Sequence, residues 1–322
     1  MNILEFESLL NQWGRERQPF LCIIDFEMEA PVAWKLNDVP REILYSINGI
    51  ANFSANPTKT NSLELAKYPM SFADYESRFN QVKESIGLGD SYLTNLTIKT
   101  RIDLKTIRED LFFQIQARYK VLWKNKFIVF SPETFIRIEN GIIHSFPMKG
   151  TIDAAIPDAE RIILEDPKEL SEHVTIVDLI RNDLSHVAND VKVERFRYVE
   201  KVKTNQKDLL QVSSEITGKL SENYGAAIGS ILVSLLPAGS ISGAPKKKTV
   251  QIIRDAEKEK RGYYTGVIGY FDGKNFDSGV MIRFVEEHEG KLYYRSGGGI
   301  TSQSVAEKEY QEAIDKIYVP VH

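Results

Sequence analysis

One lysine stands in a stretch whose neighbours restrict the backbone on both sides. Lys149 lies between Pro147 and Gly150 in F-P-M-K-G-T-I-D-A. Proline fixes the φ angle, and glycine lets the main chain approach a ligand closely. The amine could therefore be held in place against a bound molecule. The alternative is a solvated lysine in a turn, which is the commoner environment of lysine.

Three charged residues near the C-terminus have the spacing of a helix face. Glu309, Glu312 and Lys316 are three and four residues apart, which places them on one face of a helix that the pattern predicts from about 304 to 318. Ser304 and Glu307 have the spacing of a capping box that would begin this helix. The face could bind a ligand, or it could be a ladder of surface ion pairs.

A run of three glycines precedes this predicted helix. Gly297, Gly298 and Gly299 end a predicted strand in R-S-G-G-G-I-T. Glycines add no side chain to the packing and lose much backbone entropy on folding. The run therefore indicates main-chain N–H groups that lie close to an anionic ligand.

A second helix, predicted from about 166 to 182, carries acids of its own. Glu169 and Glu172 are three residues apart, and His173 follows them. Carboxylates with this spacing could bind a hard cation such as Mg²⁺, or they could form a solvated acidic face near a helix N-terminus. His173 does not complete the H-E-x-x-H spacing of a zinc site.

The elements that must position these residues predict an α+β fold. Asn140-Gly141, between two alternating segments, predicts a hairpin that leads directly to the lysine. The segments 264–271, 276–284 and 291–296 predict an antiparallel meander. Hairpins mixed with long helices, without regular βαβ alternation, favour α+β over a doubly wound sheet.

The totals exclude several classes of protein. The chain has 322 residues, of which 42% are hydrophobic and 27% charged, and its net charge is −4. This balance gives no electrostatic footprint for nucleic acid or an anionic membrane, so we expect neither as a partner. Cys22, the single cysteine, stands in an apolar stretch that predicts a core residue rather than a disulfide or metal ligand. We expect a cytoplasmic protein.

Eight blocks of the sequence resemble, in the same order, the chorismate-utilising enzymes, which include anthranilate synthase component I, aminodeoxychorismate synthase component I, isochorismate synthase and salicylate synthase. The blocks are S-P-E-T-F (131–135), P-M-K-G-T (147–151), E-H-V-T-I-V-D-L-I-R-N-D-L (172–184), P-A-G-S-I-S-G-A-P-K (237–246), Y-T-G-V-I-G-Y (264–270), V-M-I-R-F (280–284), G-G-G-I (297–300) and E-Y-Q-E-A-I-D-K (309–316). They lie between about residue 71 and the C-terminus. The resemblance implies one chorismate-binding catalytic domain over 1–322, with 1–70 as a short N-terminal part. It also implies two large antiparallel sheets that face each other, with helices outside.

The resemblance further implies a site for magnesium and chorismate. Mg²⁺ would be bound by Glu172 and Glu312, with Glu309 as an auxiliary ligand, and would hold a carboxylate of chorismate. The residues implied to contact the substrate are Gly150, Thr151, Tyr264, Arg283, the amides of Gly297, Gly298 and Gly299, and Lys316.

Lys149 separates the branches of the family. P-M-K-G-T is similar to the aminodeoxychorismate (para-aminobenzoate) synthases, whereas anthranilate synthases have alanine in this place. The resemblance implies that the lysine attacks C2 of chorismate while Glu133 protonates the departing C4 hydroxyl, and that ammonia then attacks C4 and expels the lysine. The product would be 4-amino-4-deoxychorismate, on the route to 4-aminobenzoate and folate. Leu93 stands where the isochorismate and salicylate synthases carry a lysine that activates water, so hydroxylation is disfavoured.

The resemblance also implies partners and leaves alternatives open. Ammonia would come from a glutamine amidotransferase subunit (component II), and a separate aminodeoxychorismate lyase would act on the product. Leu93, Ile152, Leu210 and Ala313 depart from the pattern common in the family. The alternatives are an anthranilate synthase component I, which the lysine disfavours, and a catalytically idle chorismate-binding scaffold.

Overall fold

The chain separates into two compact units, each built on one antiparallel sheet. The computed structural model describes residues 1–54, 64–105, 108–203 and 208–319. Each unit contains one nine-stranded sheet. The first unit is Met1–Val39, Glu133–Ser240 and Gly266–Val280, and the second is Pro40–Pro132, Ile241–Thr265 and Met281–His322. Because each unit combines three separate segments of the chain, neither is a contiguous half of the sequence. The single-domain organisation stays a prediction.

The first unit's sheet has the strand order β11-β13-β10-β9-β16-β15-β1-β2, and β12 also pairs with β13. Its strands are β1 (Phe20–Ile24), β2 (Val32–Lys35), β9 (Thr134–Glu139), β10 (Ile142–Ser145), β11 (Met148–Asp153), β12 (Asn189–Lys203), β13 (Asp208–Lys219), β15 (Val267–Phe271) and β16 (Phe276–Val280). All five residues of β1 are buried, including Cys22, which confirms that this cysteine is a core residue.

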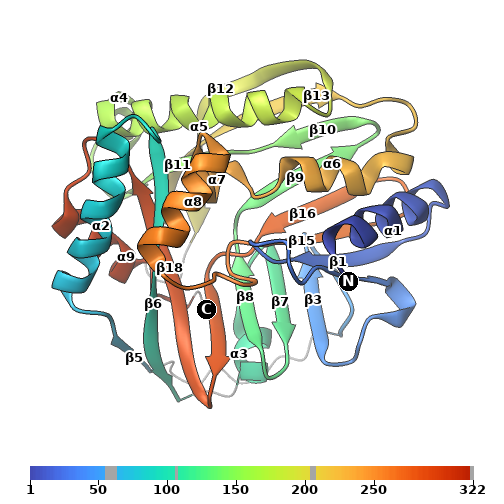
Figure 1. Ribbon diagram of the computed structural model, residues 1–322, viewed down its shortest axis with the longest axis horizontal. Coiled ribbons are helices and arrows are strands. Elements are labelled where there is room, and N and C mark those ends of the chain that lie inside the picture. Colours follow the sequence, from blue (N-terminus) through green and yellow to red (C-terminus); the bar gives the residue numbers. More distant parts are fainter. Residues whose placement is uncertain (55–63, 106–107, 204–207, 320–322) are drawn as a thin grey trace. The chain divides into compact units, whose positions relative to one another are not determined.

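Helices pack on this first sheet and on one another. They are α1 (Ile3–Arg15), α4 (Ala159–Glu165), α5 (Pro167–Ser185), the short η2 (Tyr224–Ala227) and α6 (Ile228–Leu235), and the short η1 (Leu36–Asp38) follows β2. The helices α1 and α6 lie side by side (Figure 1), with the main chain of Glu7 so close to Gly229 that a Cβ there would be 2.3 Å from its carbonyl oxygen. The long helix α5 packs against β11, β12 and β13. It therefore carries its side chains next to the Lys149 strand.

The second unit's sheet has the order β14-β6-β18-β17-β8-β7-β3-β4, and β5 pairs with β6. Its strands are β3 (Ile43–Ile47), β4 (Ile50–Ala51), β5 (Leu65–Tyr68), β6 (Leu93–Leu104), β7 (Tyr119–Trp123), β8 (Phe127–Ser131), β14 (Gly243–Ala244), β17 (Phe284–His288) and β18 (Lys291–Ile300). Its helices are α2 (Phe72–Gly87), α3 (Arg108–Gln114), α8 (Lys246–Glu257) and α9 (Ala306–Asp315), and the short α7 (Gly239–Ser242) spans the boundary of the units. Helices α2, α8 and α9 pack against β6 or β18 around a core that includes Tyr75, Phe79, Ile98 and Ile252.

The structure confirms the α+β class and the hairpin at Asn140-Gly141. Both turn residues have positive φ angles, 51° and 80°, as a two-residue type I′ turn requires. The predicted meander is present as two antiparallel pairs, β15 with β16 and β17 with β18, but the prediction that they form one sheet is wrong. β16 ends at Val280 in the first sheet, whereas β17 begins at Phe284 in the second. The apolar residues Met281 and Ile282 continue from Val280 without a Gly, Pro or Asn to mark a turn, so the pattern alone did not indicate that the chain changes sheets there.

The two predicted helices are present with small shifts at their ends. Helix α5 begins at Pro167 after Asp166, whose side chain accepts a hydrogen bond from the Glu169 N–H. The capping box predicted for α9 is wrong. The helix begins at Ala306 with no side-chain cap, because the Ser304 hydroxyl instead accepts the N–H of Thr301 at 3.1 Å in the preceding turn.

One apolar segment meets a length and composition test for a membrane-spanning helix. Tyr224–Ser242 has a mean hydropathy of 1.6, and 56% of its 18-residue window is buried inside the protein. In the structure it is divided among η2, α6 and α7. The core helix of a protein in water passes the same test, so one such segment is weak evidence for a membrane span.

Candidate functional site

Lys149 lies at a β-bulge near the beginning of β11. Met148 pairs with Ser213 and Thr151 pairs with Gln211 on β13, so Lys149 and Gly150 together oppose one residue. Gly150 has φ of +86°, and a Cβ there would lie 3.1 Å from a Glu169 carboxylate oxygen. A bulge bends the strand and re-aims its side chains. Glycine at position 150 therefore allows the positive φ angle of the bulge. Lys149 lies in a strand and its side chain is 19% exposed, so it is not a lysine in a solvated turn.

Helix α5 places a carboxylate beside this lysine. The Lys149 Nζ lies 3.4 Å from Glu172 Oε2, and the Lys168 Nζ lies 3.8 Å from Glu172 Oε1. Glu172 is 8% exposed and His173 only 1%. The interpretation of this helix face as solvated and acidic is therefore wrong for these two residues. Glu172 lies within reach of two amines rather than in open water.

The two neighbours of Glu172 on this helix titrate away from their ordinary values. The pKa of Glu169 is raised, chiefly by burial and then by the charge of Glu172, whereas Lys149 acts in the opposite direction. The pKa of His173 is lowered to about 4, because burial and the charges of Arg197 and Lys149 disfavour the imidazolium. The ring is therefore neutral at pH 7. Its Nε2 lies 2.7 Å from the Ser214 hydroxyl.

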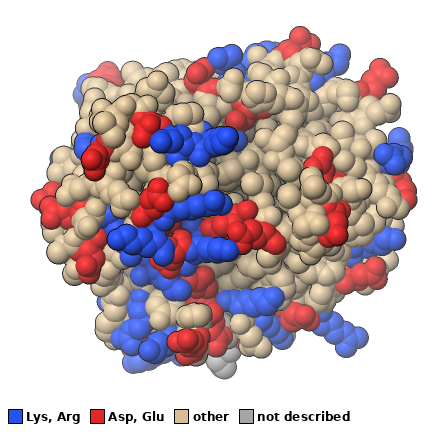
Figure 2. All heavy atoms as spheres, viewed as in Figure 1, with Lys and Arg blue, Asp and Glu red and all other residues tan. Residues whose placement is uncertain are grey.

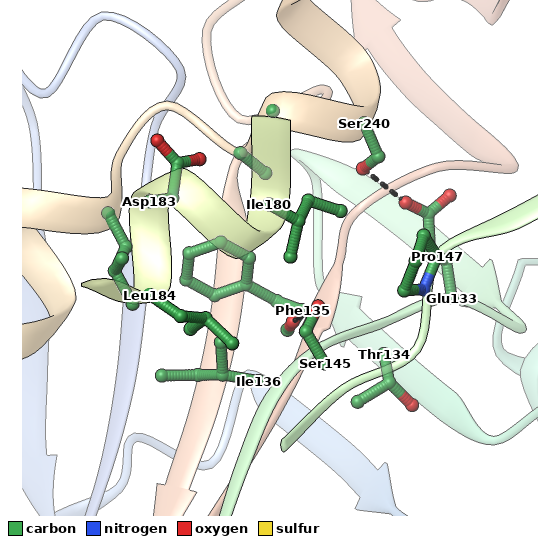
Figure 3. A pocket seen from close by; sticks show the side chains of 13 residues that line it. Glu133, Thr134, Phe135, Ile136, Ser145, Pro147, Ile180, Asp183, Leu184 and Ser240 are labelled. Atoms are coloured by element: carbon green, nitrogen blue, oxygen red, sulfur yellow. Dashed lines mark hydrogen bonds between the residues drawn. The ribbon is translucent and has the colours of Figure 1, made fainter. Parts of the chain in front are cut away.

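Glu133 lies just before β9, at one end of a small cavity of the first unit. The Ser240 hydroxyl donates to Glu133 Oε1 at 2.5 Å, and Figure 3 shows this pair at one end of the cavity with Asp183 and Leu184 at the other. Pro147, two residues before the lysine, also lines it. Its volume of about 20 Å³ leaves room for one water-sized molecule. Sequence reasoning selected Glu133 but gave no role to Ser240, although the serine stands in a quoted block.

In the second unit, α9 brings its charged face onto the glycine strand. A Cβ on Gly298 would lie 3.4 Å from Glu312 Oε1, 3.6 Å from Glu309 Oε2 and 3.6 Å from Lys316 Nζ. The Lys316 amine donates to Glu312 Oε1 at 2.6 Å and to the Gly297 carbonyl at 3.0 Å. Glu309 is 3% exposed. The three side chains therefore converge on one point of β18, which a solvated ladder would not do.

The packing of β18 against β6 explains why glycine is needed in part of the run 297–299, independently of any ligand. Gly297 to Gly299 pair with Thr97, Leu96 and Asn95 on β6, and a Cβ on Gly297 would lie 2.3 Å from the Leu96 carbonyl oxygen. In the described part of the chain, β17 pairs with β18 only as far as Arg295. The far edge of the glycine segment is therefore not used by that neighbouring strand.

Arg283 and Tyr264 lie in irregular segments of the second unit. Arg283 has φ of +54°, a backbone conformation that costs a non-glycine residue about 1–2 kcal/mol. Its guanidinium lies 5.1 Å from the centre of the Tyr318 ring. Tyr264 is 4% exposed, and burial raises its pKa to about 12. Residues held in such sparsely populated backbone conformations cluster at active sites and ligand-binding sites.

The carboxylates on α9 suit a hard cation. Glu309 and Glu312 aim oxygen atoms at the same point above Gly298, and Mg²⁺ commonly takes one or two carboxylates and completes its shell with water and substrate oxygens. No cluster of three or more His, Cys, Asp or Glu side chains with metal-binding geometry occurs among the residues that the structure describes. Two carboxylates would leave the rest of a hard cation's shell to water or other oxygens, and the Lys316 amine already bonds Glu312 Oε1 at 2.6 Å.

The structure thus brings the predicted residues together in two sets. Within the first unit, Lys149 and Gly150 meet Glu169 and Glu172. Within the second, Glu309, Glu312 and Lys316 meet Gly297 and Gly298. The remaining predicted residues are Glu133 and the exposed Thr151 in the first unit, and Tyr264, Arg283 and Gly299 in the second.

Charges of both signs are mixed on the surface. Figure 2 shows Lys and Arg side chains interspersed with Asp and Glu over the face in view. With a net charge of −4, this surface gives no one-signed patch in that view for a polyanion.

Comparisons with known proteins agree on one family. The family described as chorismate binding enzyme matches residues 27–322. A protein of Pasteurella multocida described as an uncharacterized PabA-like protein is 49% identical over 323 residues and 100% of both chains. One of Haemophilus influenzae with the same description is 48% identical over 98% of this chain and 96% of its own. Aminodeoxychorismate synthase component 1 of Salmonella typhimurium is 33% identical over 79% of this chain, which spans only 58% of that protein.

Solved structures agree on the fold. Anthranilate synthase component I of Streptococcus pneumoniae has a TM-score of 0.67 at 27% identity, over 79% of this chain and 58% of that one. A putative isochorismate synthase of Bacillus anthracis has a TM-score of 0.76 at 19% identity, over 98% and 88%. The second likeness concerns the fold alone. Because the family match extends over most of its residues, the chain belongs to the family of chorismate binding enzymes.

Proposed function

We propose that the chain is an aminodeoxychorismate synthase component I, which replaces the C4 hydroxyl of chorismate with an amine. The observation that carries the proposal is Lys149, held at a bulge with its amine 3.4 Å from Glu172. A lysine in this place supplies a nucleophile that an anthranilate-type alanine cannot. Family membership and the 33% identity to the Salmonella synthase support the same substrate.

The reaction balances with this chain's own groups. The Lys149 amine attacks C2 of chorismate, the two conjugated ring double bonds shift to C1=C6 and C4=C5, and the C4–O bond breaks as Glu133 delivers the proton that makes water. Ammonia then forms the C4–N bond, both double bonds shift back, and the C2–N bond to lysine breaks. The proton lost by the new amine restores the acid. Chorismate and ammonia thus give 4-amino-4-deoxychorismate and water, and the enolpyruvyl group is retained.

The acidic residues would hold Mg²⁺. Glu312 and Glu172 are the proposed ligands and Glu309 the auxiliary one, and the ion would supply positive charge to a substrate carboxylate. The proposed contacts to the substrate come from Arg283, the amides of Gly297, Gly298 and Gly299, Tyr264, Lys316, Gly150 and Thr151. A half-buried arginine and a glycine main chain both suit carboxylate groups.

Ammonia and the later step are assigned to other proteins. We propose a separate glutamine amidotransferase subunit as the nitrogen source, and a lyase that removes pyruvate from the product to give 4-aminobenzoate for folate. The cytoplasmic location likewise stays a prediction.

Product identification tests the proposal directly. The purified chain is incubated with chorismate, Mg²⁺ and ammonium, and the products are separated and weighed by mass spectrometry. The expected product carries an amine at C4 and keeps its enolpyruvyl group. Anthranilate would instead assign the chain to the anthranilate synthases. Unchanged chorismate, both with ammonium and with glutamine and an amidotransferase subunit, would favour the idle scaffold.

A further inference from the structure

A buried ion pair lies at the edge of β6 that faces away from the glycine strand, and the proposed chemistry does not use it. Glu257 ends α8, and Arg261 follows four residues later. Both side chains are 1% exposed. The guanidinium donates to both carboxylate oxygens, from Nη2 to Oε1 at 2.6 Å and from Nε to Oε2 at 2.9 Å. Such a fork fixes the orientation of the two groups as well as their separation.

The pair is hydrogen-bonded to one short stretch of β6. Glu257 Oε1 accepts the Thr97 N–H and the Thr97 hydroxyl, both at 2.9 Å. Arg261 Nη2 donates to the Asn95 carbonyl at 2.8 Å. The carboxylate thus accepts from a main-chain N–H and the guanidinium donates to a main-chain carbonyl, as the backbone of a paired strand would.

No strand among the described residues pairs with β6 at this place. On the edge of β6 opposite β18, β14 pairs with residues 93–94 and β5 with residues 101–104. The main-chain groups of 95–97 on that edge would otherwise need water or another partner. The ion pair therefore takes the place of a neighbouring strand there, with side chains that water hardly reaches.

The stretch that the pair fixes is the one that faces the glycines. Thr97 pairs with Gly297, and Asn95 pairs with Gly299. A Cβ on Gly297 would lie 2.7 Å from the Thr97 Cα, so the two main chains touch without a side chain between them. In the described part of the chain β17 pairs with β18 only as far as Arg295. The glycine segment is therefore held in its sheet by β6.

Arg261 also bonds to the main chain on either side of it in the sequence. Its Nη1 donates to the Ile241 carbonyl of the short helix α7 at 2.9 Å. Its own carbonyl accepts the N–H of Tyr264, a proposed contact to the substrate, at 3.2 Å. One buried residue thus joins β6 to two irregular segments of the second unit.

We propose that Glu257 and Arg261 are positioning residues, which fix the main chain of the glycine segment 297–299 through β6 and thereby set its affinity for a carboxylate of the substrate. The effect on the substrate rests on the proposed function, in which these amides bind chorismate, whereas the effect on the backbone does not. Neither side chain touches substrate in this scheme. Because N–H groups that are held in place before binding cost less to order when the anion arrives, loosening residues 95–97 weakens binding more than it slows turnover.

The test uses the full chain with substitutions at two of these positions. Arg261→Lys keeps a positive charge beside Glu257, but an ammonium group does not reproduce the planar fork and its bond to the Asn95 carbonyl. Thr97→Val keeps the ion pair and removes only the hydroxyl that bonds to Glu257, so it decides the question if Arg261→Lys does not fold. Thr100→Val is the matched control, because Thr100 lies on the same strand, is 0% exposed, and has a hydroxyl without a hydrogen-bond partner among the described residues.

Amide hydrogen exchange measures the effect on the backbone. In peptides that cover 94–98 and 296–300, exchange is expected to speed up about 10-fold in Arg261→Lys, less in Thr97→Val, and not in the control variant. Exchange at 119–123, in β7 of the same unit, should not change, because a loss of local support opens only the strands that depend on it. An equal acceleration at all three segments would mean that the pair contributes to stability alone, and would overturn the proposal.

Calorimetric titration with chorismate and Mg²⁺, without ammonium, measures the effect on the site. Affinity is expected to fall about 10-fold in Arg261→Lys and by less in Thr97→Val, with turnover at saturating chorismate within about threefold of wild type. Wild-type affinity in both variants, or unchanged exchange in both, would overturn the proposal. If the wild-type chain binds chorismate but forms no 4-amino product, the proposed function fails, and exchange and affinity still decide the positioning role.

Discussion

The amine of Lys149 and the carboxylate of Glu172 lie 3.4 Å apart, and the second carboxylate oxygen of Glu172 lies 3.8 Å from Lys168. One buried carboxylate thus lies between two amines that differ in exposure, 19% for the Lys149 side chain and 39% for Lys168. If a cation binds Glu172, its charge competes with both amines. The Lys149 amine is then released from its ion pair at the point where a nucleophile is needed.

Replacing Lys149 tests this arrangement. We expect Lys149→Ala to lower the rate of 4-amino product formation by at least about 10³-fold, because no other group at the bulge supplies the nucleophile. Chorismate affinity should change by only a few-fold. Turnover is measured with ammonium as the nitrogen source, and affinity by titration calorimetry.

Lys168→Ala is the control for charge alone. It removes the other amine that reaches Glu172 but leaves Lys149 in place, so turnover should stay within about threefold of wild type. If both substitutions had the same effect, the role of Lys149 would be electrostatic rather than nucleophilic.

Removal of the metal tests the proposed ligands. Chelation with EDTA should abolish activity, and added Mg²⁺ should restore it. Glu312→Gln should lower activity at a fixed, low Mg²⁺ concentration by at least about 100-fold, since a bound ion contributes several kcal/mol of charge stabilisation. Excess Mg²⁺ should recover part of this loss.

Glu307→Gln provides the matched comparison on the same helix. Glu307 lies in the first turn of α9 and is exposed, whereas Glu312 faces Gly298. The Mg²⁺ dependence of Glu307→Gln should match the wild type. An identical shift in both variants would mean that the helix's overall charge, and not a ligand, sets the requirement.

The pair of Glu133 and Ser240 gives a prediction for the acid. Glu133→Gln should lower turnover by about 10²- to 10⁴-fold, the usual contribution of a general acid. Ser240→Ala removes a hydrogen bond to the carboxyl group, which is worth about 1.5–3 kcal/mol when the group is charged. Its turnover should therefore fall by roughly 10- to 100-fold, and steady-state kinetics with each variant would measure both effects. A Ser240→Ala enzyme with unchanged turnover would show that the hydroxyl does not orient the acid.

The sequence predicted the parts of the site that depend on helix periodicity. Spacings of three and four residues placed Glu309, Glu312 and Lys316 on one face, and the structure has them converging on Gly298. Such spacing is a property of the helix itself, so it survives whatever the helix packs against. The hairpin turn at Asn140-Gly141 could be predicted for the same reason, because it depends only on the two residues that form it.

Features that depend on tertiary partners could not be predicted from the pattern. The prediction of a capping box at Ser304 was wrong because the Ser304 hydroxyl accepts a hydrogen bond from the Thr301 N–H instead of capping the helix. Two departures from the family pattern, Ile152 and Leu210, are far apart in the sequence but are direct partners across β11 and β13. They are one apolar cross-strand pair next to the bulge, and only strand register reveals this.

The glycine run predicts a main chain that binds a ligand, and the structure gives Gly297 and Gly298 different surroundings. A Cβ on Gly297 would meet backbone atoms, whereas one on Gly298 would meet the ends of side chains. Gly297→Ala would place a methyl group 2.3 Å from the Leu96 carbonyl oxygen, a backbone atom that cannot move without breaking the β6–β18 pairing. We expect the free energy of unfolding to fall by about 1–3 kcal/mol or more, as in other overpacked cores. Denaturant unfolding of the purified variant measures the change.

Gly298→Ala should behave in the opposite way. The atoms nearest to its methyl group would be the ends of Glu312, Glu309 and Lys316, at 3.4–3.6 Å, and long side chains can shift. The free energy of unfolding should change by less than about 0.5 kcal/mol, whereas Mg²⁺-dependent activity should fall because the carboxylates are displaced. Gly87→Ala, at the end of α2 and with open space around the new methyl group, should leave Mg²⁺-dependent activity unchanged and raise the free energy of unfolding by at most about 1 kcal/mol, because alanine favours the helix. If Gly298→Ala destabilised the protein as much as Gly297→Ala but kept full activity, the convergence of α9 on this strand would serve packing rather than the site.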